Sequence, residues 1–444
     1  MRIHFIAIGG VIMHSLAIEL KKQGHHISGS DDNIYDPSRK RLLEYGLLPE
    51  ETGWFPDQIH SEIDLVLLGM HAKKNNPELN KAQKIQLPIL SFPEFISNYH
   101  KYKKRIVIAG SHGKTTITSM ILHVLSDNNI EVDYLLGASN QSFKNLVSLK
   151  KNNILLVEGD EYFSSYIDKR PKFMHYKPDI LVVSGVSWDH INVFPTLESY
   201  ETAFKNIIRQ VVDNCGKIFY CGDDNFLSNY LTRSEKHIPY FLPNYKINNH
   251  QCCLIQNNQI IKLHVFGKHN LYNINAALGV CLELGLSCDQ FYNSISKYRA
   301  AYKRLSLIKK GESSSIYFDF AHSPSKVLAT INAVKELYPE RYLISCFELY
   351  TFSSLNKEFI PQYENAFKKS NEVWIYVDLN SNKLQNNLSA SLIRNSINHS
   401  LVYIIERPLD LKKKLEKIDL ENLNLLIMSS GNISGIDLLE LFKT

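Results

Sequence analysis

The chain has 444 residues, with 50 lysines and arginines against 45 aspartates and glutamates, so its formal net charge is +5. This excess is too small to indicate nucleic-acid binding, and a composition with 44% hydrophobic residues excludes general disorder. Seven cysteines without a CxxC pair indicate reduced thiols rather than a disulfide framework or a zinc module. No apolar run approaches the ~18 residues needed to cross a bilayer. We expect a cytoplasmic protein of about three domains that does not bind membranes or nucleic acid.

The N-terminal segment alternates between predicted strands and helices. The apolar run Ile3–Ile8 is followed by Gly9-Gly10 and then by helical spacing over Met13–Lys22. Further strands are predicted at His26–Ser28 and Leu65–Leu68. This alternation predicts a parallel sheet with helices on both faces.

The same alternation repeats in two later segments, each preceded by a polar and basic stretch at residues 100–105 or 298–310. The middle segment has predicted strands at Ile106–Ala109, Ile154–Val157 and Ile180–Val183, a hairpin at Leu254–Val265 and a helix at Asn273–Leu284. The last segment has predicted strands at Ser315–Asp319 and Leu425–Met428 and a helix from Ile436. The sequence therefore predicts three successive α/β segments.

The strongest chemical signal is the sequence GSHGKTT at residues 110–116, between a predicted strand and a predicted helix over Ile117–Leu125. Glycines let backbone N–H groups approach an anion, and the N-terminus of a helix favours negative charge. Lys114 can reach the outer phosphates of ATP, and Thr115 can place its hydroxyl on Mg²⁺. The loop is shorter than the common GxxxxGK[ST] pattern. A glycine-rich turn with a solvated lysine is the alternative interpretation.

Two further candidates follow the next predicted strands. Glu158, in the sequence VEGDEY at residues 157–162, is our preferred Mg²⁺ ligand, with an acidic turn as the alternative. His190, in the sequence SWDH at residues 187–190, can bind a second Mg²⁺ or position a phosphate, with Asp189 orienting its ring. A purely structural histidine is the alternative for His190.

The first segment carries a weaker nucleotide signal. Gly9 and Gly10 would let the backbone approach a pyrophosphate, and Asp31 stands 21 residues after Gly10, near the position of a ribose-binding acid. Ala7 replaces the first glycine of the GxGxxG pattern, and position 12 has no glycine. A nucleotide-diphosphate site therefore fits better than a dinucleotide site, and a plain strand-to-helix turn is the alternative.

Three more sets of residues are candidates for substrate contacts. Asn270 and Asn273 suit a purine edge because amides both donate and accept, although the residues alone favour helix capping. Asp319 and His322 follow the predicted strand that opens the last segment. The pair Lys303-Arg304 could supply charge to a transferring phosphoryl group. A structural aspartate and a basic linker remain the alternatives.

Taken in order, the motifs GG, GSD, GSHGKTT, VEGDE, DH, GKHNxxN, KR and DFAHSP resemble the Mur ligase family over nearly the whole chain. The start of the chain resembles the branch that contains UDP-N-acetylmuramate–L-alanine ligase and murein peptide ligase. The sequence DKRPKFMHY at residues 168–176 is more similar to the latter. The resemblance implies a Rossmann-like UDP-sugar domain over residues 1–102, a central P-loop ATPase domain over 103–300 and a Rossmann-like domain for the amine substrate over 301–444.

The resemblance also implies the reaction and its partners. The lactyl carboxylate of UDP-N-acetylmuramate would attack ATP, and an amine would then attack the resulting acyl phosphate, with ATP and Mg²⁺ required. The favoured acceptor is the peptide L-Ala-γ-D-Glu-diaminopimelate, and free L-alanine is the alternative. The enzyme would be a monomer or a weak homodimer.

The resemblance implies a role for each matching residue. The catalytic residues would be Lys114, Glu158 and His190, and the metal ligands Thr115, Glu158 and His190. The ATP site would contain Gly110, Ser111, His112, Gly113, Lys114, Thr115, Thr116, Asn270, Asn273, Arg304 and Asp319. The UDP-sugar site would contain Gly9, Gly10, Ser30, Asp31 and His71, and the amine site His322 and Tyr350.

Several positions depart from the pattern of the family. Relatives usually carry Glu at Ser187, Asp at Asn192, Arg at Lys303, Glu at Ser306, a second His at Ser323 and His at Tyr350. The changes at Ser187 and Tyr350 affect the expected amine contacts most. Three other functions remain open at this point: a P-loop ATPase switch, a dehydrogenase with two Rossmann-like ends, and a regulator that has lost catalysis. The failed GxGxxG pattern argues against the second, and the presence of Lys114, Glu158 and His190 against the third.

Overall fold

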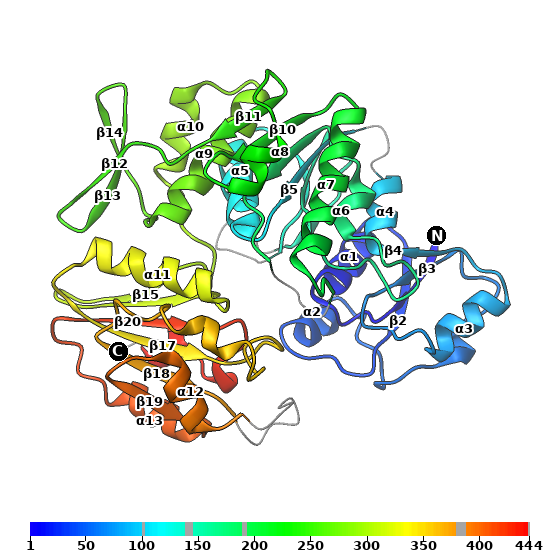
Figure 1. The fold of residues 1–444 in the computed structure, drawn as a ribbon. Helices are drawn as coiled ribbons and strands as arrows, with labels where there is room; N and C mark the ends of the chain where they lie inside the picture. The colour runs from blue at the N-terminus through cyan, green and yellow to red at the C-terminus, as the bar shows by residue number, and fades with distance from the viewer. Residues whose placement is uncertain (100–102, 138–144, 189–192, 379–387, 443–444) are drawn as a thin grey trace. The chain divides into compact units, whose positions relative to one another are not determined.

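The computed structural model describes residues 1–99, 103–137, 145–188, 193–378 and 388–442 (Figure 1). The chain forms two compact units, the first made of Met1–Phe241 with Ala276–Leu286 and the second of Leu242–Asn275 with Ser287–Thr444. Three mainly parallel sheets and one small antiparallel sheet are found in the described residues, which confirms the predicted α/β class. Among these residues, no helix is long and apolar enough to cross a membrane. The proposed boundaries after residues 102 and 300 stay predictions.

The first unit begins with a parallel sheet of order β2-β1-β3-β4, as the alternation of strands and helices predicts. Its strands are β1 (Arg2–Ile6), β2 (His26–Ser30), β3 (Leu65–Leu68) and β4 (Ile89–Ser91), and its helices are α1 (Val11–Lys22), α2 (Ser38–Glu44), α3 (Pro77–Lys84) and α4 (Phe92–Tyr99). The prediction that the first strand reaches Ile8 is wrong. The backbone turns at Ala7, whose φ is +70°, and the N–H groups of Ala7 and Ile8 both donate to the carbonyl of Ser30.

The same unit contains a seven-stranded sheet of order β11-β10-β9-β5-β8-β6-β7. All its neighbours pair in parallel except β6 and β7. The strands are β5 (Lys104–Ala109), β6 (Asp133–Leu135), β7 (Val147–Ser148), β8 (Ile154–Glu158), β9 (Ile180–Val183), β10 (Lys217–Cys221) and β11 (His237–Tyr240). The helices are α5 (Lys114–Asp127), α6 (Lys172–Tyr176), α7 (Leu197–Asp213) and α8 (Asn225–Tyr230). Because β5, β8 and β9 are parallel neighbours, their carboxyl ends meet at one edge of the sheet.

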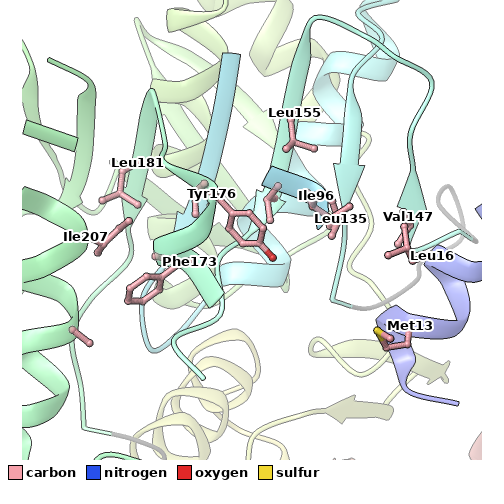
Figure 2. Packing of buried hydrophobic residues seen from close by; sticks show 14 of the residues in the cluster. Met13, Leu16, Ile96, Leu135, Val147, Leu155, Phe173, Tyr176, Leu181 and Ile207 are labelled. Carbon is pink, nitrogen blue, oxygen red and sulfur yellow. The ribbon is translucent and has the colours of Figure 1, made fainter. Parts of the chain in front are cut away.

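One buried hydrophobic cluster joins this sheet to the first one. Alternate residues of the central strands, such as Val107 and Leu155, point into this cluster, as do Phe204 of α7 and Leu16 of α1. Figure 2 shows Leu16 beside Val147 at one side of the cluster and Phe173 beside Ile207 at the other. Burying both faces of the central strands explains why they are continuous apolar runs in the sequence.

The second unit contains a small antiparallel sheet and a six-stranded sheet of order β15-β16-β20-β17-β18-β19. The small sheet is β12 (Tyr245–Asn248), β13 (Gln251–Gln256) and β14 (Gln259–Lys262), and it contains the predicted hairpin. The larger sheet is β15 (Ser306–Lys310), β16 (Ser315–Asp319), β17 (Tyr342–Glu348), β18 (Glu372–Tyr376), β19 (Val402–Ile405) and β20 (Leu423–Met428).

The helices that follow these strands are α10 (Cys288–Ile295), α11 (Pro324–Leu337), α12 (Ala390–Ile397), α13 (Pro408–Glu416) and α14 (Leu438–Leu441). Helix α9 (Lys268–Glu283) is divided between the units after Asn275, and it begins before the predicted Asn273. Its first turn therefore includes Asn270.

Phe204 offers a test of the shared core. Its side chain is fully buried, and its ring lies 5.5 Å from that of Phe173 and 5.2 Å from that of Tyr200. We expect Phe204→Ala to lower the free energy of unfolding of the first unit by about 3–5 kcal/mol, because it removes apolar contacts and leaves a cavity. Leu197→Ala, on the same helix but 46% exposed, should change it by less than about 0.5 kcal/mol. Denaturant unfolding followed by circular dichroism measures both, and equal effects would contradict this packing.

Candidate active site

The loop from β5 to α5 is fixed against the end of β9. Gly110 has φ +120° and Gly113 has φ +75°, conformations that favour glycine. A Cβ atom on Gly110 would lie 2.7 Å from the backbone nitrogen of Ser184, so the close approach also requires glycine there. The backbone nitrogen of Ser111 donates to the carbonyl of Gly185 at 3.0 Å. Helix α5 then begins at Lys114 and presents its N-terminus to this loop, as a phosphate site requires.

Lys114 lies in a strongly acidic and mostly buried environment. Its Nζ atom is 2.7 Å from Glu161 Oε2 and donates to the carbonyl of Gly110 at 2.7 Å. The lysine side chain is 15% exposed and that of Glu161 is 1% exposed. Burial alone would lower the pKa of Lys114, but Glu161, Asp160 and Glu158 outweigh it and hold that pKa above its ordinary value. The lysine therefore stays positively charged beside the loop.

Thr115 and Glu158, the two predicted oxygen ligands, lie side by side. Thr115 Oγ1 donates to Glu158 Oε1 at 2.8 Å, and the backbone nitrogen of Gly137 donates to Glu158 Oε2 at 2.8 Å. A Cβ atom on Gly137 would lie 2.8 Å from the carboxylate carbon of Glu158. A hydroxyl and a carboxylate side by side at the start of a phosphate-binding helix fit Mg²⁺, which prefers hard oxygen ligands. The third expected ligand, His190, lies outside the described residues, as do Asp189 and Asn192.

Two buried hydroxyls connect the loop to Glu161. Tyr200 OH lies 3.2 Å from Glu161 Oε1 and 2.9 Å from Ser111 Oγ. Ser111 Oγ also receives a hydrogen bond from the backbone nitrogen of Ser187 at 2.7 Å. Neither Glu161 nor Tyr200 is among the predicted site residues. The VEGDE sequence already contains Glu161, whereas no sequence signal distinguishes Tyr200 from other apolar-face residues of α7.

The charged residues of the segment DKRPKFMHY form ion pairs within the first unit. Arg170 pairs with Asp168 at 2.7 Å and with Glu94 of α4 at 3.4 Å, and His175 Nε2 lies 3.1 Å from Asp168 Oδ2. Lys172 pairs with Asp160 at 2.6 Å. Burial would raise the pKa of Asp160, but Lys172 and Lys114 outweigh burial and hold it below its ordinary value. The segment therefore supports the acidic residues around Lys114.

The predicted nucleotide residues of the first sheet form a separate cluster. The backbone nitrogen of Gly9 donates to Asp31 Oδ2 at 2.8 Å, and a Cβ atom on Gly9 would lie 2.9 Å from that oxygen. Ser30 Oγ donates to Glu78, a buried acid that the sequence analysis does not include in the site. Gly10 precedes α1, and its carbonyl accepts the N–H of His14. His71 is exposed in the same unit, and its predicted role stays a prediction.

In the second unit, Asp319 links three elements. Its Oδ1 accepts the backbone nitrogen of Leu305 at 2.9 Å, its Oδ2 accepts Thr330 Oγ1 at 2.6 Å, and its carbonyl accepts the backbone nitrogen of Ser429. The Arg304 guanidinium lies 4.8 Å from the centre of the Phe320 ring. Asp319 therefore holds the loop that carries Arg304.

The predicted purine and amine contacts also belong to the second unit. Asn270 and Asn273 are buried near the start of α9, and Asn270 Nδ2 donates to the carbonyl of Phe266 at 2.9 Å. His322 Nε2 lies 3.4 Å from Lys326 Nζ, and Tyr350 is 41% exposed. Glu348, which the sequence analysis does not predict, is buried beside the loop after β20 and accepts hydrogen bonds from Ser429 and Ile433. Burial raises the pKa of Glu348.

Two family models match the chain. The model described as the Mur ligase family, catalytic domain, matches residues 2–104, and the model of the Mur ligase middle domain matches residues 108–281. Together they cover more than half of the sequence, including the cluster around Asp31 and the loop around Lys114.

The relatives that are similar to the chain carry two different enzyme names. UDP-N-acetylmuramate–L-alanyl-γ-D-glutamyl-meso-2,6-diaminoheptandioate ligase of Haemophilus influenzae is 28% identical over 75% of this chain and 76% of its own length. UDP-N-acetylmuramate–L-alanine ligase of Clostridium kluyveri is 28% identical over 82% of this chain and 81% of its own length. The solved structure of UDP-N-acetylmuramate–alanine ligase of Thermotoga maritima has the same fold, with a TM-score of 0.74, 20% identity and coverage of 98% and 97%.

The raised pKa of Asp31 predicts that the free energy of unfolding depends on pH. Burial raises its pKa from 3.8 to about 6, helped by Asp32 and opposed by the hydrogen bond from Gly9. The folded state therefore binds this proton more tightly than the unfolded state does. The contribution of Asp31 to the free energy of unfolding is fully present below about pH 4 and is lost as the pH rises through about 6.

We expect Asp31→Asn to remove this loss, because the amide oxygen can still accept from Gly9 without carrying a charge. Its melting temperature relative to the wild type should rise between about pH 4 and pH 7. Asp57→Asn, an exposed control in the same unit, should show no such trend. A difference between Asp31→Asn and wild type that is constant across this range would contradict the prediction.

Proposed function

Because this chain belongs to the Mur ligase family of ATP-dependent amide-bond ligases, we propose that it joins the lactyl carboxylate of UDP-N-acetylmuramate to the amine of an alanine-starting acceptor. The observation that carries the proposal is the group formed by Lys114, Thr115 and Glu158 at the carboxyl ends of β5 and β8. This group fits a bound nucleotide triphosphate, and it lies in the same unit as the Gly9–Asp31 cluster.

The reaction needs ATP because a carboxylate is a poor acyl donor at neutral pH. Attack of the lactyl carboxylate on the γ-phosphate gives an acyl phosphate and ADP, and attack of the amine then gives the amide and releases phosphate. Lys114 leaves Glu161 to neutralise the phosphate oxygens as the phosphoryl group moves. Exclusion of water from the site protects the acyl phosphate from hydrolysis.

The remaining residues take the roles that their chemistry supports. Thr115 and Glu158 would hold Mg²⁺, which supplies positive charge to the phosphates, and His190 is proposed as a further ligand. Gly9, Gly10, Ser30, Asp31 and His71 are proposed for the UDP-sugar. Asn270, Asn273, Arg304 and Asp319 are proposed for the nucleotide, together with the loop Gly110–Thr116. His322 and Tyr350 are proposed for the amine.

The favoured acceptor is the peptide L-Ala-γ-D-Glu-diaminopimelate. The support is the segment DKRPKFMHY, which resembles murein peptide ligases and which here forms ion pairs next to Lys114 through Lys172 and Asp160. The similar ligase of Haemophilus influenzae carries this acceptor in its name. Free L-alanine is the second candidate, favoured by an equal identity to the Clostridium kluyveri enzyme over a larger share of the chain.

Phosphate release from ATP distinguishes the acceptors. We expect release in the presence of UDP-N-acetylmuramate, Mg²⁺ and the tripeptide, and background release with L-alanine or without an acceptor, because water must be excluded from the acyl phosphate. The product should be identified by mass spectrometry. Release with alanine alone would assign the second candidate, and equally fast ATP hydrolysis without any UDP-sugar would contradict both.

Lys114→Ala tests the phosphate loop itself. Removing a fixed positive charge from the transferring phosphoryl group should lower kcat by roughly 10²–10³-fold. Lys236→Ala, an exposed lysine of the same unit, should retain wild-type turnover. Steady-state phosphate release under saturating substrates measures both. Near wild-type turnover of Lys114→Ala would refute the role of this loop.

A further inference from the structure

Tyr200 occupies the centre of a buried hydrogen-bonded chain beside Lys114. The residue lies in the first turns of α7 and is fully buried, with its ring packed against those of Phe194 and Phe204 at 5.2 Å each. Its hydroxyl lies 3.2 Å from Glu161 Oε1 on one side and 2.9 Å from Ser111 Oγ on the other. A single phenol therefore connects the acid that holds Lys114 with the loop that precedes it.

The hydrogen-bonding capacity of these groups sets the direction of the chain. Glu161, ionised beside Lys114, can only accept, so the proton of the Tyr200 hydroxyl goes to Glu161 Oε1. The Ser111 hydroxyl then has two acceptors within reach, the phenol oxygen at 2.9 Å and the carbonyl of Ser187 at 2.8 Å, and its own oxygen receives the backbone N–H of Ser187 at 2.7 Å. The Tyr200 hydroxyl thus lies between Glu161 and Ser111 and links the loop to Glu161 through α7.

The chain matters most when Lys114 leaves Glu161. The proposed transfer of the lysine to the nucleotide phosphates removes the partner that lies 2.7 Å from Glu161 Oε2. Glu161 is 1% exposed, so water cannot readily replace that partner, and a buried carboxylate that loses a partner is destabilised. A hydrogen bond to its other oxygen keeps the charge stabilised and the side chain in place.

We propose that Tyr200 is a positioning residue of the ATP site, whose hydroxyl stabilises Glu161 when Lys114 moves to the nucleotide and keeps Ser111 of the phosphate loop in register. This inference rests on the proposed role of Lys114. Tyr200 acts through Glu161 and Ser111 and does not itself touch the phosphates in this account. Its contribution belongs to nucleotide binding, and the UDP-sugar site lies apart from it on the first sheet.

Tyr200→Phe removes the hydroxyl and keeps the ring packing. We expect the dissociation constant of AMPPNP with Mg²⁺, measured by isothermal titration calorimetry without sugar or acceptor, to rise about tenfold. The KM for UDP-N-acetylmuramate should stay unchanged. Tyr220→Phe is the matched control: Tyr220 is a buried tyrosine of β10 whose hydroxyl donates to the carbonyl of Leu231 at 3.4 Å, and its loss should leave AMPPNP affinity unchanged.

A double-mutant cycle separates this role from general packing. If the hydroxyl acts through the charge of Glu161, Tyr200→Phe should weaken AMPPNP binding far less in a Glu161→Gln background than in the wild type. Unchanged affinity in Tyr200→Phe would overturn the proposal, and so would an equal loss in Tyr220→Phe or an undiminished effect in the Glu161→Gln background. The readout needs no ligase product, so a chain that binds AMPPNP but forms no amide would refute the proposed function and leave this inference standing.

Discussion

The parallel pairing of β5 with β8 and β9 is the constraint on which the rest of the site depends. The register places Ile108 opposite Glu158 and Ala109 opposite Val183, so three strands end within one row of residues. The loop after β5 therefore meets the acids after β8 and the backbone after β9 without long connections. Glycine at position 110 is needed because the backbone at Ser184 leaves no room for a Cβ atom. The chemistry of the loop is in this sense a consequence of the strand order.

The residues gathered at this edge are charged and mostly buried, so electrostatic interactions determine how they are arranged. Three acids, Glu158, Asp160 and Glu161, surround Lys114, and each has a second partner: Thr115, Lys172 or Tyr200. A buried ion pair gains little stability on its own, because both charges lose water. Under the proposed function, its value is that Glu161 keeps a second donor, the Tyr200 hydroxyl, when Lys114 moves to the nucleotide. The same network resists the addition of further negative charge unless a cation accompanies it, which fits a nucleotide that enters with Mg²⁺.

The sequence predicts the parts of this site that are local in the chain. Lys114 and Thr115 follow a strand and open a helix, and Glu158 ends a strand, so apolar runs and glycines are enough to place them. Tyr200 could not be predicted, because its partners Ser111 and Glu161 are distant in sequence and a tyrosine on the apolar face of a helix looks like core. The end of the first strand was also mispredicted. Ala7 and Ile8 are as apolar as the strand before them, and only the carbonyl of Ser30 on the neighbouring strand draws their N–H groups out of the ladder.

The charged residues of the segment DKRPKFMHY form ion pairs inside the first unit. Arg170 pairs with Asp168 and Glu94, and Lys172 pairs with Asp160. The pair between Lys172 and Asp160 holds this segment beside the acids that surround Lys114. Under the proposed function, the acceptor would be selected by side chains that stay accessible, and Tyr350, packed against Gly431 and 41% exposed, is one of them. Because relatives usually carry histidine at that position, the proposed choice between alanine and a peptide depends on Tyr350 as well as on this segment.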